Sequence, residues 1–270
     1  MTSDSASRMI ELGRRRLLPA VALTLAVGLW WAPARAAGDD SLQILKKMSD
    51  YLASQKTVSV VFDTDIEVIT SDLEKIQFAS STELEMSRPD KLHVHRVGGY
   101  ADVELVYDGK TLSLFGKHIN SFTQVADAGT IDQLADHLTT NYGMAAPGAD
   151  LLRSDVYDAL AADVLVAKHI GRGVINGVEC EHLAFRNHDT DWQIWIEVGD
   201  RPVPWKFVIT SKTVAQAPQY TLRMREWKTG VPPAADAFEF KPPQGATKVA
   251  FESLQGIDEV PPGVAPGANQ

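Results

Sequence analysis

The sequence predicts a mainly β protein with a few α-helices, built as a curled antiparallel sheet under a helical lid. From residue 58 onward, most of the chain carries hydrophobic residues at every second position, which is typical of half-buried strands. Turn signals such as YDGK at 107–110 and NG at 176–177 separate neighbouring strands, so most connections are too short for a parallel crossover. Two segments with helical periodicity interrupt the strands, and each has one apolar edge that can cover the sheet.

The N-terminal segment 1–36 predicts a cleavable secretory signal peptide. Three arginines at 14–16 precede an apolar run at 17–31, and Ala34 and Ala36 have the spacing of a signal-peptidase site. The apolar run is shorter than the roughly 20 residues of a membrane-spanning helix. We therefore expect export to the periplasm. An uncleaved N-terminal anchor is the alternative, and the general and twin-arginine export routes both stay open.

The composition favours a dispersed acidic protein. The chain has a net charge of −9, and loss of the signal peptide, whose own net charge is +3, makes it −12. Binding to nucleic acid needs clustered lysine and arginine, so this class is not expected. Cys180 is the only cysteine, which excludes an intramolecular disulfide. The remaining length fits one domain at 37–255, and a Pro- and Gly-rich tail at 256–270 is expected to be disordered.

The domain opens with a helix at 39–55 and continues with strands. Leu42, Leu45, Met48 and Leu52 recur at three- and four-residue steps and form one apolar stripe of this helix. The hydrophobic period then changes to two. The strand-like segments are 58–68, 76–86, 91–97, 103–107, 111–115, 164–175, 178–187, 192–198, 205–213 and 220–227.

Two further helical segments follow the fifth strand. The first, at 129–143, begins with a capping box formed by Thr130 and Gln133. The second has Ser154 as its expected N-cap. Between them lies GMAAPGAD at 143–150, which is rich in Gly, Pro and Ala. We expect this connection to serve as the hinge of the lid.

The stretch CEHLAFRNHDTDWQIWIE at 180–197 contains residue types that often carry chemistry. Alternation places Cys180 and His182 on one strand face. A zinc site would need three or four convergent ligands, and a nucleophilic cysteine would need a base and an orienting group. We prefer the interpretation that the stretch is two strands joined by the polar loop NHDTD.

The motif HVH places His93 and His95 on one strand face, at a spacing that a metal site can use. Two partly exposed strand histidines are the preferred interpretation. The sequence has no G-x-S-x-G, H-E-x-x-H or C-x-x-C motif and no phosphate-binding glycine loop. We therefore predict no catalytic residue, no metal and no cofactor, and a protein that is not an enzyme.

Three segments resemble, in order, parts of the LolA family of periplasmic lipoprotein carriers. They are RPDKLHVH at 88–95, VYDGKTLSLF at 106–115 and AFEFKPPQGA at 237–246. The middle of the chain, with GVECEHLAFR, DWQIWIEVGDRPVPWKFVIT and PQYTLRMREW, is more similar to an uncharacterised family of predicted periplasmic proteins that is thought to share the LolA/LolB-like fold. The resemblance implies an incomplete β-barrel with a helical lid over an apolar cavity.

The same resemblance suggests which residues bind a ligand. The arginine of the Arg-Pro motif holds the lid closed in the carrier, and Arg88 occupies that motif here; the alternative is that Arg88 only fixes the turn before Pro89. Alternation directs Leu92 and Val94 inward, although the carrier has an aromatic residue at the position of Val94. Further wall residues are expected to be Val58, Val60, Phe62 and Leu105, and the expected lid residues are Ile131, Leu134 and Leu138.

Together these features predict an exported periplasmic protein that binds or carries a lipid, a lipoprotein acyl chain or another hydrophobic ligand in a cavity between sheet and lid. Apolar clefts with a few polar groups are the usual binding sites for small molecules. The alternative is a non-enzymatic sensor or envelope-assembly module that binds a protein partner, with an edge strand or an exposed apolar loop as the contact. In either case a monomer is expected.

Overall fold

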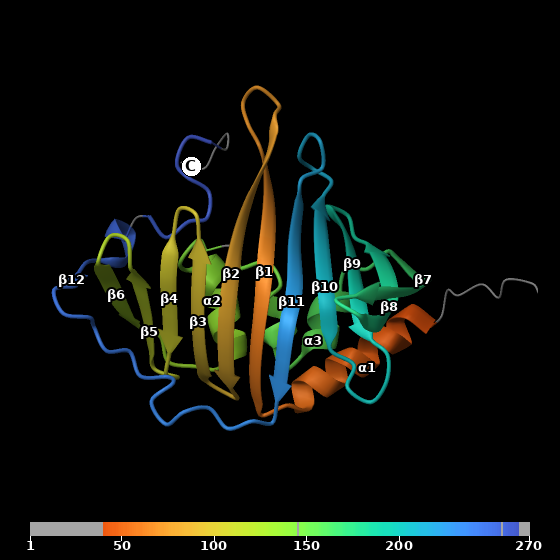
Figure 1. Cartoon of the computed structure of the whole chain (residues 1–270), viewed down its shortest axis with the longest axis horizontal. Helices are drawn as coiled ribbons and strands as arrows, with labels where there is room; N and C mark the ends of the chain where they lie inside the picture. The colour runs from red at the N-terminus through yellow and green to blue at the C-terminus, as the bar shows by residue number, and fades with distance from the viewer. Residues whose placement is uncertain (1–39, 145, 255, 265–270) are drawn as a thin grey trace, which may run out of the picture. The chain divides into compact units, whose positions relative to one another are not determined.

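Twelve strands form one open sheet within residues 40–144, 146–254 and 256–264, which the computed structural model describes. The strand order is β12-β6-β5-β4-β3-β2-β1-β11-β10-β9-β8-β7, so β12 and β7 are the two edges and the sheet does not close (Figure 1). All neighbouring pairs are antiparallel except β12 and β6, which run parallel. The predicted fold class, a curled antiparallel sheet covered by helices, is confirmed.

The bounds of the strands agree with the predicted segments to within a few residues for ten of the twelve. The strands are β1 (Thr57–Ile69), β2 (Lys75–Ser87), β3 (Lys91–Gly98), β4 (Asp102–Tyr107), β5 (Thr111–Gly116), β6 (Ser121–Ala126), β7 (Val166–Ile175), β8 (Val178–Arg186), β9 (Thr190–Glu197), β10 (Pro204–Ser211), β11 (Gln219–Thr229) and β12 (Thr247–Lys248). Sequence analysis did not predict β6, which is short, or the two-residue β12.

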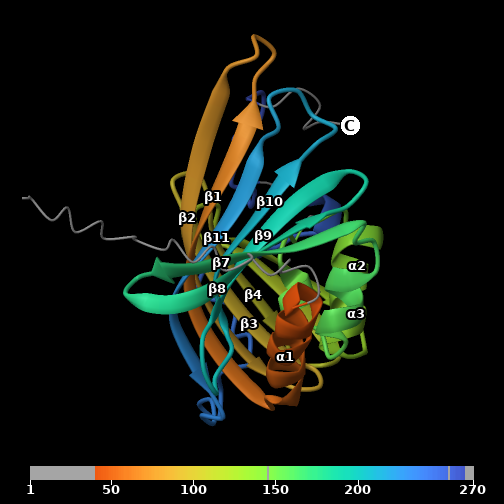
Figure 2. The same cartoon turned by 90° about the vertical axis from the view of Figure 1, so that its right-hand side faces the viewer.

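The three α-helices lie on one face of the curled sheet, as Figure 2 shows. The helices are α1 (Asp40–Ser54), α2 (Ile131–Thr140), the 3₁₀ turn η1 (Ala149–Leu152), α3 (Val156–Ala161) and the 3₁₀ turn η2 (Phe251–Ser253). The segment α2–η1–α3 is the lid. None of the helices in the described ranges is long and apolar enough to cross a membrane.

Helix α1 buries its apolar stripe against the rest of the domain. Leu45, Met48 and Leu52 are almost completely buried, and the helix packs on α3 and β7. Leu42 was predicted to belong to this stripe, but 36% of it is exposed. The buried part of the stripe therefore begins at Leu45, and Leu42 in the first turn of the helix lies outside it.

Two of the tight turns have the geometry that their sequences indicate. Asp108 accepts hydrogen bonds from the backbone N–H groups of Lys110 and Thr111 at 2.9 and 2.8 Å, which fixes the YDGK turn between β4 and β5. Asn176 and Gly177 have φ values of 51° and 83°, the backbone that a two-residue hairpin turn requires. These turns set the register of the strands on either side.

The lid begins as the sequence predicts but continues differently. Thr130 and Gln133 form the expected capping box at the start of α2. Ser154, however, does not cap α3: the N-cap is Asp155, and the Ser154 backbone N–H instead donates to Asp132 at 2.8 Å. The prediction for Ser154 is wrong because the Asp132 carboxylate on α2 competes for it. The bond joins the two lid helices.

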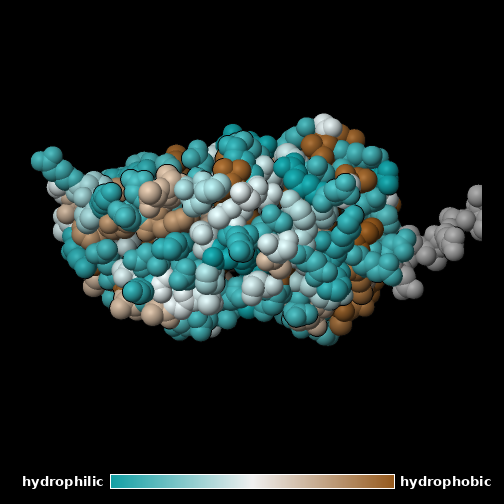
Figure 3. Space-filling view, turned by 90° about the horizontal axis from the view of Figure 1, so that it is seen from below, coloured by the Kyte–Doolittle hydropathy of each residue, from teal (hydrophilic) through white to brown (hydrophobic). Residues whose placement is uncertain are grey.

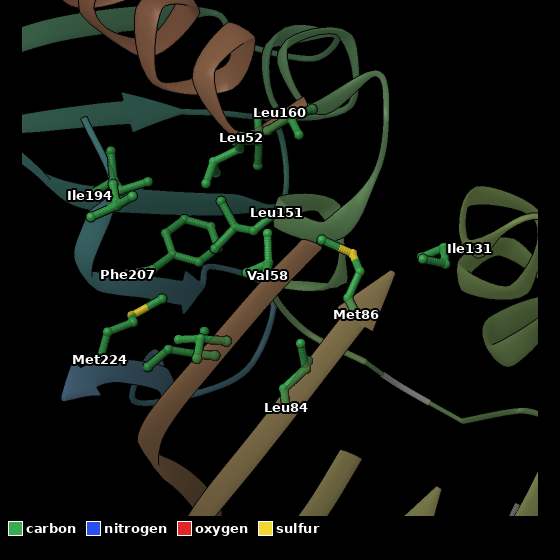
Figure 4. Packing of buried hydrophobic residues seen from close by; sticks show 14 of the residues in the cluster. Leu52, Val58, Leu84, Met86, Ile131, Leu151, Leu160, Ile194, Phe207 and Met224 are labelled. Atoms are coloured by element: carbon green, nitrogen blue, oxygen red, sulfur yellow. The ribbon is translucent and has the colours of Figure 1, made fainter. Parts of the chain in front are cut away.

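The hydrophobic core fills the space between the lid and the part of the sheet nearest α1. Figure 4 shows Leu52 of α1, Leu160 of α3 and Leu151 of η1 facing Val58 and Phe207 of the sheet, and all five residues belong to the buried cluster. Ile131 lies apart from this group, on α2. The space under the lid is thus solidly packed at one end.

Candidate ligand-binding cavity

A cavity of about 210 Å³ lies between the inner face of the sheet and the lid. Its walls are almost entirely apolar and come from β1 to β5, β11, α2, η1, the loop before η1 and one residue near the C-terminus. The lining residues are Val60, Phe62, Thr82, Leu84, Leu92, Val94, Arg96, Val103, Leu105, Leu114, Leu138, Met144, Ala146, Pro147, Gly148, Ala149, Leu151, Leu152, Tyr220, Leu222, Met224, Trp227 and Ile257.

Strand alternation produces the sheet side of this cavity. On β3, Leu92, Val94 and Arg96 line the cavity. The residues between them, His93 and His95, contact carboxylates of the neighbouring strand β4 instead, His93 with Glu104 at 3.0 Å and His95 with Asp102 at 2.8 Å. A period of two therefore gives this strand an inner side that is apolar up to Arg96 and an outer side on which His93 and His95 meet carboxylates.

The loop between α2 and η1 forms the lid side. Gly148 has a φ of +87°, and a Cβ at this position would meet Leu222 Cδ1 of β11 at 3.0 Å. Only glycine fits both the left-handed backbone and the close approach. The loop thus lies directly on β11 and covers the cavity there.

Hydrogen bonds hold α2 over the sheet. The Ile131 backbone N–H donates to Pro89 O at 2.8 Å. Near the other end of α2, Asp127 contacts His137 Nδ1 at 2.8 Å and accepts from Tyr142 Oη at 2.9 Å. Burial and this hydrogen bond to Asp127 raise the pKa of Tyr142 to about 12, so the hydroxyl keeps its proton for the bond.

Arg88 connects the sheet to both covering elements. Its Nη2 donates to Arg153 O at the end of η1 at 3.0 Å, and its Nε donates to Gln55 O after α1 at 3.2 Å. Arg153 in turn forms ion pairs with Asp136 of α2 and with Asp155, both at 2.7 Å. The guanidinium of Arg88 therefore binds the lid, as the Arg-Pro motif suggested, but it is not among the lining residues of the cavity.

Six of the ten predicted binding residues line the cavity and four do not. The six are Val60, Phe62, Leu92, Val94, Leu105 and Leu138. Val58, Ile131 and Leu134 are buried but do not line the cavity, and Arg88 holds the lid from outside the cavity. Since α2 extends along the sheet, only its last inward residue, Leu138, reaches the cavity.

A family model described as "Predicted periplasmic protein (DUF2092)" matches residues 41–252. The chain belongs to this family. The match confirms the expected membership of a family of periplasmic proteins and the expected location. No curated protein matches the chain.

Several solved structures are similar to this DUF2092 protein at low sequence identity. The Pseudomonas aeruginosa MucA/MucB complex is 13% identical with a TM-score of 0.44, over 75% of this chain and 61% of that chain. The Mycobacterium tuberculosis lipoprotein LppX is 13% identical with a TM-score of 0.44, over 70% of this chain and 94% of the other. An uncharacterized conserved protein of Thermus thermophilus is 11% identical with a TM-score of 0.44, over 78% of this chain and 98% of the other. The DUF2092 chain spans about three fifths of the matched chain in the MucA/MucB complex.

Sequence analysis missed most of the cavity of this DUF2092 protein. Arg96 was not predicted, although the alternation that directs Leu92 and Val94 inward directs it inward as well. The same alternation could also have predicted the inner residues of β11, among them Leu222 and Met224. The loop residues had no such signal, because a loop without periodicity does not show which side chains point inward.

Polar groups gather where Arg96 meets the C-terminal segment. Arg96 Nη2 donates to the carbonyl of Ile257, whose side chain lines the cavity. Glu259 accepts from Thr64 Oγ1 at 3.0 Å and from Ser80 Oγ, and burial raises its pKa. These contacts come from residues 256–264 of the tail that was predicted to be disordered, and residues 265–270 of that tail lie outside the described residues.

The cysteine stretch is a hairpin, β8 and β9. His182 stacks on Trp195 with ring centroids 4.1 Å apart and contacts Gln193 at 3.0 Å, while Cys180 Sγ donates to Val178 O at 3.5 Å. The thiol and the imidazole thus have separate partners. Burial raises the pKa of Cys180 to about 11, which disfavours the nucleophilic thiolate.

The part of the chain that the structure describes contains no group of three or more His, Cys, Asp or Glu side chains arranged to hold a metal ion. Each histidine of the HVH motif has a carboxylate partner on β4. The expectation that no metal or cofactor binds stays a prediction. The cavity is the feature of this DUF2092 protein that best fits a binding site.

Proposed function

We propose that this protein binds a hydrophobic ligand, such as a lipid or the acyl chain of a lipoprotein, in the cavity between sheet and lid in the periplasm. The supporting observation is the apolar cavity of about 210 Å³. An apolar cavity of about 150 Å³ in another protein stays dry and binds benzene. A space of this size and lining therefore favours an apolar guest over water.

The volume also limits what the closed form holds. Sites for drug-sized molecules measure about 300–1,000 Å³, so the present cavity accepts a short chain or part of a longer one. Each buried methylene contributes about 0.8 kcal/mol, so a longer chain gains affinity if the lid moves outward. The loop 143–150 joins the two lid helices, and Gly143 and Gly148 in it have left-handed backbone, which supports its proposed role as hinge.

A pair of Val-to-Trp variants on β3 tests this function. Val94 lines the cavity, whereas Val97 is 43% exposed on the outer side of the same strand. Val94→Trp should fill the cavity and lower the affinity for a fluorescent acyl probe at least about tenfold, which corresponds to about 1.4 kcal/mol. Val97→Trp should bind the probe like the unmodified protein.

Native mass spectrometry of protein purified from the periplasm gives a second measurement. Co-purified lipid in the unmodified protein and in Val97→Trp, but not in Val94→Trp, is the expected result. If all three proteins carry no lipid and bind no acyl probe, the proposal is wrong. Melting temperatures of the three proteins separate a filled cavity from a failure to fold.

The alternative function, binding of a protein partner, has one observation in its favour. The edge strand β7 exposes Val166, Ile170 and Val174. The same strand is interrupted at Ile170, where its register with β8 shifts, and Lys168 and Arg172 lie on it beside the exposed hydrophobic residues. Bulges and charges are features that prevent the addition of a further strand. The cavity is therefore the better-supported site.

A further inference from the structure

The polar end of the cavity carries a charge. Of the described residues that line it, Arg96 is the one with a charged side chain. Its Nε is buried and has no hydrogen-bond partner among the described residues, while Nη2 donates to the Ile257 carbonyl. A guanidinium has five N–H donors, and a buried charge is costly when its donors lack partners. This end of the cavity therefore favours a group with several negatively charged acceptor atoms.

The C-terminal segment already places matching groups there. The side chain of Ile257 lines the cavity, and its carbonyl oxygen accepts a hydrogen bond from Arg96. Two residues later, the carboxyl group of Glu259 accepts hydrogen bonds from the hydroxyls of Thr64 and Ser80. An apolar group attached to an oxygen acceptor is the chemical pattern of an amphiphile. The segment 257–259 thus occupies the positions that a bound amphiphile would use.

We infer that the ligand is a single-chain amphiphile with an anionic head group, which binds Arg96 and displaces the segment 257–259 from the end of the cavity. This inference rests on the proposed function. The Ile257 carbonyl accepts one bond from Arg96 and carries no charge. A carboxylate or phosphate adds an opposite charge and can accept two parallel N–H bonds from the guanidinium, so an anionic head group binds Arg96 more strongly than the carbonyl does. The acyl chain then takes the place of the Ile257 side chain.

Binding of four probes with the same alkyl chain tests the head group. They are laurate, dodecyl phosphate, dodecanol and dodecylamine, and calorimetry measures their affinities. Laurate or dodecyl phosphate should bind at least about tenfold more tightly than dodecanol, and dodecylamine should bind most weakly. The order of the two anions identifies the head group as carboxylate or phosphate.

Substitution of the arginine then assigns the preference to one side chain. Arg96→Gln should abolish the preference for the anionic probes over dodecanol, and Arg96→Lys should retain part of the preference. Arg225→Gln is the matched control, because Arg225 is half-exposed and pairs with Asp63 at 3.4 Å. Ile257→Ser should strengthen the binding of dodecanol, since it removes the competing apolar side chain from the cavity.

The outcomes separate the two proposals. If none of the four probes binds, the proposed function is wrong. If dodecanol binds as tightly as laurate and dodecyl phosphate, or if Arg96→Gln weakens all probes equally, the cavity binds apolar chains and the inference about Arg96 is wrong. Circular dichroism of Arg96→Gln and Arg96→Lys shows whether a loss of binding reflects a loss of fold.

Discussion

Arg88 lies just before β3 and Arg96 lies within it, and the two side chains have different roles in the domain. Arg88 precedes β3 and donates to backbone carbonyls of the two covering elements. Arg96 lies inside β3, at the end of its inner row. Both are partly buried, so each side chain needs acceptors that other elements supply. Arg88, before the strand, finds its acceptors after α1 and after η1, whereas Arg96, inside the strand, finds one on the C-terminal segment.

Cys180 is a residue whose chemistry is set by burial. Its pKa is raised from 9.0 to about 11, so the thiol form is favoured in the folded state. The folded chain keeps this proton at pH values where the unfolded chain has lost it. The free energy of unfolding should therefore fall as the pH rises from about 9 towards 11.

Two measurements check this prediction. In native protein at neutral pH, Cys180 should react with a disulfide reagent far more slowly than in denatured protein. Cys180→Ser should remove part of the loss of stability between pH 9 and 11, as followed by urea unfolding. Rapid labelling of the native protein would contradict the burial of the thiol.

At the scale of elements, polar contacts hold the lid at its helices, and the loop between α2 and η1 lies on the sheet. Tyr107 Oη donates to Gly129 O at 2.9 Å before α2, and Asp127 holds the other end of this helix through His137 and Tyr142. Arg153 joins η1 to both helices. The loop between α2 and η1 lies on β11 at Gly148. Opening at this loop breaks fewer polar contacts than opening at α2.

Two glycine variants test the role of the loop. Gly143 and Gly148 have φ values of +63° and +87°, so an alanine at either position costs about 1 kcal/mol in backbone strain. Only Gly148→Ala also brings a Cβ to 3.0 Å from Leu222, because no atom of the described residues lies within 4 Å of the Cβ position at Gly143. Gly148→Ala should therefore reduce stability more, and it should release a bound acyl probe faster.

Urea unfolding and stopped-flow release of the probe measure these two effects. Equal stabilities and equal release rates in Gly143→Ala and Gly148→Ala would show that the loop does not rest on β11 when the cavity is closed.

At the scale of the whole molecule, one open sheet serves two purposes. The buried hydrophobic cluster extends along both halves of the sheet, and its members on β1 to β5 and on β11 border the cavity. None of the described lining residues lies on β7 to β10. The surface seen from below in Figure 3 is mostly hydrophilic, with hydrophobic residues in separate patches.

Removal of a bound ligand should lower the stability of the whole domain. A ligand that binds only the folded protein stabilises it by about 2.7 kcal/mol at a concentration one hundred times its dissociation constant. For a domain of this size, each kcal/mol shifts the melting temperature by about 2–4 °C. Delipidated protein should therefore melt several degrees lower, and added laurate should restore the value.

Scanning calorimetry of the purified, delipidated and reloaded protein checks this expectation. Val94→Trp serves as the control, since its melting temperature should not respond to laurate. An identical response in Val94→Trp would place the stabilising site outside the cavity.

Much of the fold was predictable because it depends on local patterns. The two-residue period of β3 indicated the inner row with Leu92 and Val94, the capping box indicated the start of α2, and the NG turn indicated the hairpin of β7 and β8. The short strand β6 was missed because its six residues, SFTQVA, contain few apolar positions. Its partner β5 decides its conformation through the ladder between them.

Periodicity and turn chemistry along the chain were enough to predict ten of the twelve strands, the helices and the inward side of most of them. Only the tertiary structure decided where the interior is packed and where it is hollow. Val58 and Val60 lie on the same side of the same strand, yet only Val60 lines the cavity. The difference arises because Leu52 of α1 faces Val58, as Figure 4 shows, whereas Val60 shares the cavity with loop residues 146–148, which lie far away in the sequence.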